Sequence, residues 1–253
     1  MIPKIIHQIA PLDDYRWHPV WKICHQTVRN TFNDFQLFLW GDGEDIGDFV
    51  RDRYPEHFEF YSALPSHIER IDFSRYCILD YYGGIYADMD MFFYKNPYQL
   101  LNNNSYLLNP FSFDDSPVIM NCFMVANEKS TFFKKVIEEC KNNYTPHEVN
   151  TLDDVYQFTT KTTGPKFLYQ CYEKYSDLVE LLDMDTYHAP IYKYNENIIS
   201  KHLKTQIWGD ECFFVMDKLF CSMNISSEEG LLKCFNEVRG IDIKNFDFYR
   251  DYD

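Results

Sequence analysis

The sequence predicts an α/β fold. Short β-rich runs alternate with helical patterns through the first half of the chain. No repeat, low-complexity segment or long linker is visible in the 253 residues. Of these residues 45% are hydrophobic and 18% are aromatic, which is ample for a packed core. We therefore expect one large domain, with at most a modest appendage.

The first elements form a strand–helix–strand unit. Residues 3–10 (PKIIHQIA) are a short β-rich run, and residues 17–32 read as a helix with a proline near its start. Residues 35–40 (FQLFLW) form a second apolar run, which the turn sequence GDGED closes. This order of elements builds parallel α/β sheets.

A long helix and a strand follow. Residues 45–64 suggest short helices broken at Pro55. A helical pattern begins at Ser66 and ends at Gly83, as helices commonly end at glycine. Residues 84–94 (GIYADMDMFFY) then read as one strand.

The later elements are predicted with the same signals. We expect strands at 105–113, 118–126 and within 178–192, and helices at 129–144, 164–175 and 226–238.

Charge limits the possible partners. Acidic residues outnumber basic residues by 39 to 24, and the formal net charge is −15. Such a chain should repel nucleic acid and anionic membrane surfaces. No stretch approaches the ~20 apolar residues of a membrane span, and the N-terminal apolar run is too short for a signal peptide. We expect a cytoplasmic protein with no nucleic-acid partner.

The eight cysteines are scattered and form no CxxC pair. This pattern argues against a zinc knot and against a disulfide framework. We expect reduced, mostly buried thiols.

The most informative stretch is RIDFSRYCILDYYGGIYADMDMFF, residues 70–93. On a helix, Asp72 and Arg75 lie three residues apart and share one face. In an extended strand, Asp88 and Asp90 point to one side and the intervening methionine to the other. The order helix, glycine pair, strand brings both polar pairs toward one end of a sheet.

Each polar pair also has an ordinary structural explanation. An aspartate and an arginine at this spacing commonly form a local ion pair, and carboxylates after a strand commonly form turns. Two adjacent carboxylates in a core-like stretch, however, repel each other and lose hydration unless a cation lies between them. Oxygen ligands suit Mg²⁺ or Mn²⁺, which keep positions open for phosphate oxygens. Asp88 and Asp90 are thus candidate ligands of a hard divalent cation.

A ten-position string within this stretch resembles a family signature. It resembles that of DXD-containing glycosyltransferases of family 32, the α-1,6-mannosyltransferase and capsular-polysaccharide type, whose core the glucosylating clostridial toxins share. The segments IPKIIHQIA, VIMNCFMVANEKSTFF and TTGPKF are similar to further parts of the family, so the likeness covers roughly residues 2–170. The ten positions are Arg70, Asp72, Arg75, Tyr76, Leu79, Gly83, Gly84, Tyr86, Asp88 and Asp90.

The resemblance implies a fold and an activity. It implies a single GT-A catalytic domain over residues 1–253, with a Rossmann-like mixed central sheet flanked by helices. The divergent part from about 197 to 253 would cover the active site or the acceptor side. The implied reaction moves a sugar from a nucleoside diphosphate sugar, UDP-linked in preference to GDP-linked, to a glycan or protein acceptor. Mn²⁺ or Mg²⁺ would assist, and anomeric configuration would be retained.

The resemblance also implies residue roles. Asp90 would ligate the metal directly, and Asp88 would contact the ribose or donor sugar and help hold the metal. Asp72 would hold donor hydroxyls, and Arg75 would approach the sugar or the diphosphate. Asn121 matches the family's sugar-contacting asparagine.

Other residues are expected at the donor on the same ground. His202 would complete the metal site and Trp208 the leaving-group site. Gln8 stands where the related toxins carry an aromatic residue against the nucleobase. The remaining expected donor contacts are His7, Ile9, Tyr76 and Met89.

Two other functions remain open at this point. A Mg²⁺-dependent phosphohydrolase or nuclease also uses paired carboxylates, although such sites usually draw on several dispersed acidic and histidine residues. A sugar-nucleotide-binding protein that has lost catalysis would keep the same donor residues. The oligomeric state is not indicated.

Overall fold

The fold is described from a computed structural model. The structure describes residues 1–17, 19–113, 115–189 and 195–203. Trp208 and the helix predicted at 226–238 lie outside these residues. No helix among the described residues is long and apolar enough to cross a membrane.

A six-stranded mixed sheet forms the centre of the molecule. All neighbouring pairs are parallel except those made by the fourth strand in the order, which runs antiparallel to both of its neighbours. The mixed sheet that the family resemblance implies is therefore confirmed. The strand order is β2 (Gln36–Gly41), β1 (Ile5–Ala10), β3 (Gly84–Ala87), β8 (Phe123–Ala126), β5 (Tyr106–Leu108) and β9 (Glu180–Leu182).

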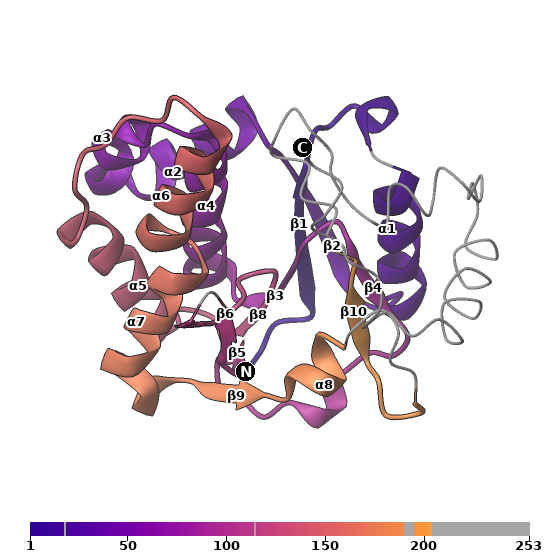
Figure 1. Cartoon of the computed structure of the whole chain (residues 1–253). Helices are drawn as coiled ribbons and strands as arrows, with labels where there is room; N and C mark the ends of the chain where they lie inside the picture. Colours follow the sequence, from indigo (N-terminus) through magenta and orange to yellow (C-terminus); the bar gives the residue numbers. More distant parts are fainter. Residues whose placement is uncertain (18, 114, 190–194, 204–253) are drawn as a thin grey trace, which may run out of the picture.

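Helices and two small strand pairs surround this sheet (Figure 1). The pairs are both antiparallel: β4 (Met91–Phe93) with β10 (Ser200–His202), and β6 (Phe111–Phe113) with β7 (Ser116–Val118). The α-helices are α1 (Pro19–Thr31), α2 (Glu44–Arg53), α3 (Pro55–Ala63), α4 (His67–Tyr82), α5 (Thr131–Asn142), α6 (Leu152–Thr162), α7 (Pro165–Tyr175) and α8 (Met184–Tyr187).

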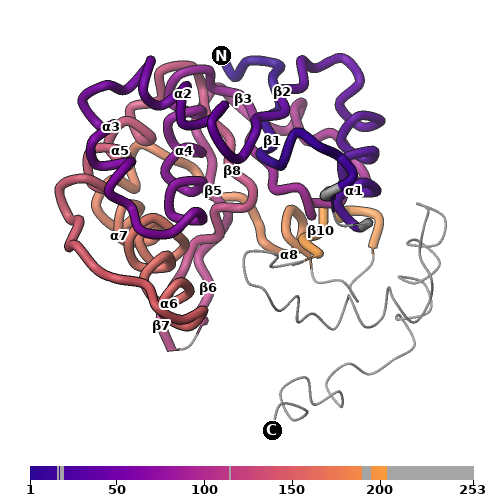
Figure 2. The backbone as a smooth tube through the Cα atoms, turned by 90° about the horizontal axis from the view of Figure 1, so that it is seen from above, coloured from indigo at the N-terminus to yellow at the C-terminus, as the bar shows by residue number. Residues whose placement is uncertain are grey.

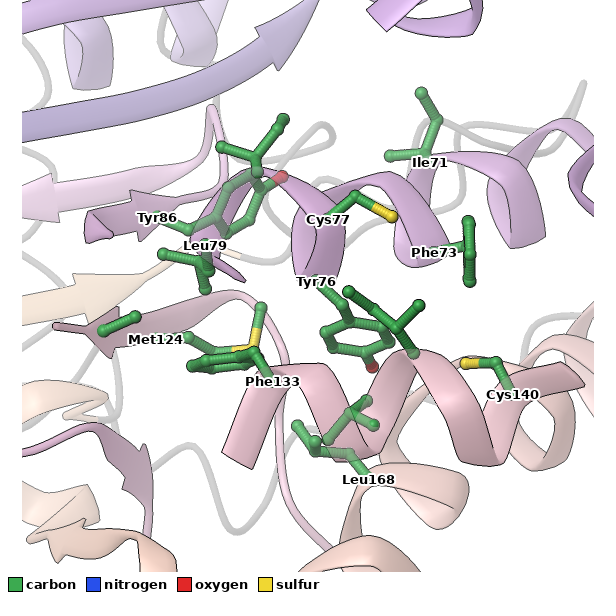
Figure 3. Packing of buried hydrophobic residues seen from close by; sticks show 14 of the residues in the cluster. Ile71, Phe73, Tyr76, Cys77, Leu79, Tyr86, Met124, Phe133, Cys140 and Leu168 are labelled. Atoms are coloured by element: carbon green, nitrogen blue, oxygen red, sulfur yellow. The ribbon is translucent and has the colours of Figure 1, made fainter. Parts of the chain in front are cut away.

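The two faces of the sheet bury separate apolar clusters, because successive strand residues point to opposite faces. On β3, Tyr86 belongs to one cluster, whereas Ile85 and Ala87 belong to the other. The first cluster packs under α2 to α5 and α7, and α4 and α5 meet there around Tyr76 and Phe133 (Figure 3). The second cluster packs under α1, which lies on the opposite side of the sheet (Figure 2).

Helix α4 delivers the polar residues of the sequence signature to the sheet. A capping box between Ser66 and Glu69 fixes its start. Gly83 caps its C-terminal end with a φ of 64°, a left-handed value that glycine adopts more easily than other residues, and β3 begins at the next residue. Gly84 has a φ of 91° and lies so close to β1 that an added Cβ would be 2.5 Å from the carbonyl oxygen of Ile5.

Some expectations about the elements were wrong. Residues 84–94 are two strands, β3 and β4, because a turn at residues 88–90 interrupts them; the amide of Met91 donates to the carbonyl of Asp88 at 3.1 Å. Only residues 123–126 of the strand predicted at 118–126 lie in the central sheet. Helix α6 and strand β10 were not predicted, and residues 178–192 contain both β9 and α8.

Gly84 provides a test of this packing. Gly84→Ala should lower the free energy of unfolding by about 2 kcal/mol or more, because the methyl group meets the β1 backbone and the positive φ disfavours a side chain. Urea unfolding followed by circular dichroism measures it. Gly47→Ala within α2 is the control: its added Cβ meets only ordinary contacts with Tyr61, and helix propensity predicts a gain of up to about 1 kcal/mol. Equal unfolding midpoints for the two variants would contradict the close approach of β3 to β1.

Candidate functional site

A cavity of about 500 Å³ opens where β1 and β3 end. In α/β folds, ligands bind at the carboxyl ends of the strands. The turn at 88–90 forms the floor of the cavity, α4 forms one wall, and the first turn of α7 adds Pro165 and Lys166. The hairpin β6–β7 and α6 supply an apolar end, at which Phe113 and Tyr156 lie with ring centroids 6.5 Å apart.

A buried arginine links two carboxylates in this cavity. The Arg75 Nη1 atom lies 3.2 Å from Asp72 Oδ1, and its Nη2 atom lies 3.2 Å from Asp88 Oδ1. The guanidinium also stacks over the ring of Tyr86 at 5.1 Å, and the Tyr86 hydroxyl donates to Asp88 Oδ1 at 2.8 Å. The predicted helix pair and the predicted carboxylate pair are thus joined by one side chain.

The second carboxylate of the turn meets a histidine from a distant part of the sequence. His202 Nε2 lies 3.1 Å from Asp90 Oδ1. The pairing of β10 with β4 creates this contact, because it places His202 opposite Met91. The backbone adds a further tie, since the amide of Leu203 donates to the carbonyl of Asp90 at 3.0 Å.

Asp88, Asp90 and His202 together fit a divalent cation. One possible ligand atom from each residue lies within 4.8 Å of the other two. Two carboxylates and one imidazole suit Mn²⁺ or Mg²⁺ better than a thiophilic metal. Both contacts of Asp88 with its neighbours use Oδ1. The buried Nε of Arg75 has no hydrogen-bond partner among the described residues, as expected of a group that awaits an anionic ligand.

Burial and charge shift the ionisation of this cluster. Burial raises the pKa of Asp72 to about 7, although Arg75 opposes the shift. Burial likewise raises the pKa of Asp88, again against Arg75 and with repulsion from Asp90 adding to the shift. Burial, the largest single effect, would lower the pKa of His202, but Asp90 and Cys122 together outweigh it, so the pKa is raised well above its usual value. The carboxylates are therefore short of positive charge, which a bound cation would supply.

Most of the sequence-predicted residues meet at this cavity. The turn at 88–90 differs from the straight strand assumed for it, so Met89 faces the cavity together with its two neighbouring carboxylates, contrary to the alternation expected. The predicted residues that line the cavity are Ile9, Asp72, Arg75, Asp88, Met89, Asp90, Asn121 and His202.

Three other predicted residues lie behind the cavity wall. His7 is fully buried; its Nε2 donates to the carbonyl of Gly83 at 2.9 Å, and its Nδ1 accepts from Trp40 at 3.2 Å. His7 therefore has both ring nitrogens occupied by the fold. Gln8 is also fully buried and reaches the carbonyl of Asp88 at 3.5 Å, so it supports the turn from below.

Tyr76 is the third of these residues. Its hydroxyl donates to the carbonyl of Thr163 at 2.5 Å. The Thr163 hydroxyl in turn donates to Asp72 Oδ2 at 3.5 Å. Tyr76 thus fixes the segment before α7 that holds Asp72, and its contribution to the site is indirect.

The sequence did not identify several residues at this site. Tyr86, although part of the family signature, was not expected to bind Asp88. Cys122 and His188 lie next to His202, and no local motif marks them. The aromatic residues of the cavity could not be distinguished in a chain with 20 tyrosines and 22 phenylalanines.

Comparison with known proteins gives consistent results. Residues 19–107 match the sequence model described as "Glycosyltransferase sugar-binding region containing DXD motif". The mannosyl phosphorylinositol ceramide synthase SUR1 of Saccharomyces cerevisiae is 30% identical over 176 residues, which are 69% of this chain and 43% of the yeast protein. Its homologue CSH1 is 29% identical over 223 residues, which are 84% of this chain and 55% of CSH1. The chain thus spans about half the length of these relatives.

A viral relative and a solved structure give two further comparisons. An uncharacterized glycosyltransferase, L373, of Acanthamoeba polyphaga mimivirus is 37% identical over 98 residues, 38% of each chain. The solved apo structure of the glycosyltransferase GlyE of Streptococcus pneumoniae matches with a TM-score of 0.50 at 14% identity, over 93% of this chain and 64% of GlyE. That likeness concerns the fold, which is the GT-A fold. The resemblance drawn from residues 70–90 is therefore confirmed: residues 19–107 match the sugar-binding region of glycosyltransferases that contains the DXD motif, and 69% of the chain is similar to SUR1.

Proposed function

We propose that this protein is a divalent-metal-dependent glycosyltransferase that uses a nucleoside diphosphate sugar. One observation carries the proposal. The Arg75 bridge between Asp72 and Asp88 adjoins the group Asp88, Asp90 and His202 in a single cavity. Side chains that can bind sugar hydroxyls, an anion and a cation are thus adjacent. A sugar diphosphate with its metal ion needs all three kinds of contact.

The chemistry follows from charge. Breaking the bond between the anomeric carbon and the diphosphate oxygen leaves negative charge on the departing diphosphate. A cation held by Asp88, Asp90 and His202 would neutralise that charge. Arg75 has its Nε atom available for a charge-assisted hydrogen bond to the same group. Asp72, held between Arg75 and Thr163, would accept hydrogen bonds from donor hydroxyls.

The donor sugar is proposed from the named relatives. SUR1 and CSH1 carry names that specify mannosyl transfer, so mannose is the sugar that we propose. Whether UDP or GDP carries it is decided by the assay described below. Retention of anomeric configuration belongs to the proposal through the family resemblance, and it requires no dedicated protein base.

The acceptor would enter from the apolar end of the cavity. Phe111, Phe113, Val118 and Tyr156 line that part of the cavity. The yeast relatives are named for an inositol-containing lipid, and a lipid-linked or glycan acceptor would fit a polar centre with an apolar approach. A protein acceptor has less support from these names.

Asp90→Ala tests the proposal as a whole. Removing this ligand should lower the transfer rate by about 10³-fold, on the scale of metal and oxyanion contacts. The assay follows nucleoside diphosphate release with Mn²⁺, UDP- and GDP-sugars, and mannose or inositol-bearing acceptors. The thermal stabilisation that Mn²⁺ and a nucleoside diphosphate give the wild type should also disappear.

Asp177→Ala is the matched control for Asp90→Ala, because this aspartate is exposed beyond the far end of α7. It should leave rate and stabilisation unchanged. Phosphodiester hydrolysis without preference for nucleotide sugars would contradict the proposal. Nucleotide binding with no turnover on any acceptor would favour the inactive sugar-nucleotide-binding protein.

Arg75→Lys tests the bridge. Lysine keeps the positive charge, but its single ammonium group cannot bridge both carboxylates as the planar guanidinium does, so kcat/KM should fall by about 10²-fold. Arg53→Lys, at an exposed arginine stacked on Tyr81, is the control and should keep wild-type kinetics. A fall in kcat/KM of less than about threefold for Arg75→Lys would show that charge alone is required.

The raised pKa of Asp72 predicts a pH effect on stability without metal or donor. Its pKa is near 3.9 in the unfolded chain and about 7 in the folded chain. Between these values the folded state holds a proton that the unfolded state has released, so the free energy of unfolding falls as pH rises through this window. The asparagine of Asp72→Asn does not titrate, so this contribution to the pH dependence is absent in the variant. The melting temperature of Asp72→Asn minus that of the wild type should therefore increase between pH 5 and pH 8, measured in EDTA. A constant difference would contradict the shift.

A further inference from the structure

Two side chains next to His202, those of Cys122 and His188, have no chemical role in the donor site described above. His188 Nε2 lies 2.9 Å from His202 Nδ1. The ligand atoms of Cys122, His188 and His202 all lie within 4.8 Å of one another, and all three residues are buried. We propose that Cys122, His188 and His202 form a second cation site, selective for Zn²⁺, which shares His202 with the donor site.

The ligand types separate the two sites. A thiolate and two imidazoles are a set that binds zinc, and three protein ligands with one further position are common in proteins. Two carboxylates and one imidazole favour a hard cation such as Mn²⁺. The two groups therefore prefer different metals, although they have one residue in common.

The spacing of the cluster is close to what zinc requires. Two nitrogens bound to one tetrahedral zinc lie about 3.3 Å apart, given zinc–nitrogen bonds of about 2.05 Å. The observed 2.9 Å between His188 and His202 is a direct hydrogen bond, so a metal needs the two rings to separate by only a few tenths of an ångström. Such a shift is within the reach of side-chain rotation.

The backbone holds the three ligands in place before any metal binds. The carbonyl of Cys122 accepts from the amide of Asp88 at 2.8 Å, and the amide of His188 donates to Met184 at 2.9 Å. The segment after α8 is tied to β10, because the amide of Ala189 donates to the carbonyl of Ser200 at 3.2 Å. Preorganised ligands pay less ordering entropy when they bind a metal.

A metal could reach the site through the cavity. Cys122 and His202 line the cavity, and His188 lies behind them with 7% of its surface exposed. Among the described residues this is the one group that could hold a metal and includes a cysteine.

Zinc binding would change what His202 offers to the donor site. On binding, the Cys122 thiol loses its proton to solvent, the proton shared between His188 Nε2 and His202 Nδ1 leaves these two nitrogens, and His202 binds through Nδ1. A neutral imidazole has one lone pair, so its proton then remains on Nε2. That Nε2–H donates to Asp90 and cannot ligate a cation. Zinc would thus remove His202 from the Mn²⁺ group, a consequence that rests on the proposed function.

The test measures metal binding without turnover. The full chain is stripped with chelator and titrated with Co²⁺, which gives a thiolate-to-cobalt absorption band, and Zn²⁺ then displaces the cobalt. The wild type and Cys140→Ala, which removes a buried thiol from α5, should show the band. Cys122→Ala should lose it, and His188→Gln should weaken Zn²⁺ affinity at least about tenfold.

Further arms separate this site from the donor site. Asp88→Asn should leave the cobalt band and Zn²⁺ affinity unchanged. Zn²⁺ should raise the Mn²⁺ concentration needed for half-maximal binding, seen by electron paramagnetic resonance, more in the wild type than in His188→Gln, in which only direct competition at the donor site remains. If the cobalt band appears but Mn²⁺ does not bind, the proposed donor site is contradicted and the zinc site is not. Unchanged Zn²⁺ affinity in Cys122→Ala, or in His188→Gln where the former does not fold, would overturn the zinc site.

Discussion

The buried arginine between two carboxylates is the interaction on which the site depends. Arg75 comes from α4, and one of its partners, Asp88, comes from the turn after β3, so the ion pairs hold helix and sheet together at the cavity. A buried charge with a missing partner is costly, whereas a complete network is tolerated. The fold therefore needs Asp72, Arg75 and Asp88 to be present together, even though each has a chemical role in the proposed reaction. This shared requirement explains why a helix face and a turn must be placed so accurately.

That accuracy has local causes. The capping box starts α4 at a fixed residue, and the positive φ of Gly83 and Gly84 lets the chain turn at once into β3 against β1. Four residues of strand then end in the turn that holds the carboxylates. The position of the turn therefore depends on Gly84: a side chain on this residue would displace β3, and with it the turn at 88–90.

The sequence predicted the sheet, the helix boundaries around Ser66 and Gly83, and the polar cluster, because each has a local signal. It failed where long-range pairing decides. The turn at 88–90 was read as a strand, since alternating polar and apolar residues satisfy a strand pattern equally well. Strand β10 is three residues long and forms only by pairing with β4, so neither the strand nor the position of His188 beside His202 could be derived from local sequence. Helix α6 is polar apart from a few residues, although its capping box at Thr151 and Asp154 was a signal that could have revealed it.

The position of His202 gives this site a property that the signature alone does not contain. Its Nε2 faces Asp90 and its Nδ1 faces His188, so the ring lies between an oxygen-rich group and a group with sulfur and nitrogen. One neutral imidazole can bind a metal through only one of these nitrogens while the other keeps its proton. The tautomer of a single residue would therefore decide which group holds a cation. The cysteine spacing could not have indicated this group, because a site with one thiolate and two distant histidines has no spacing pattern that a sequence search could detect.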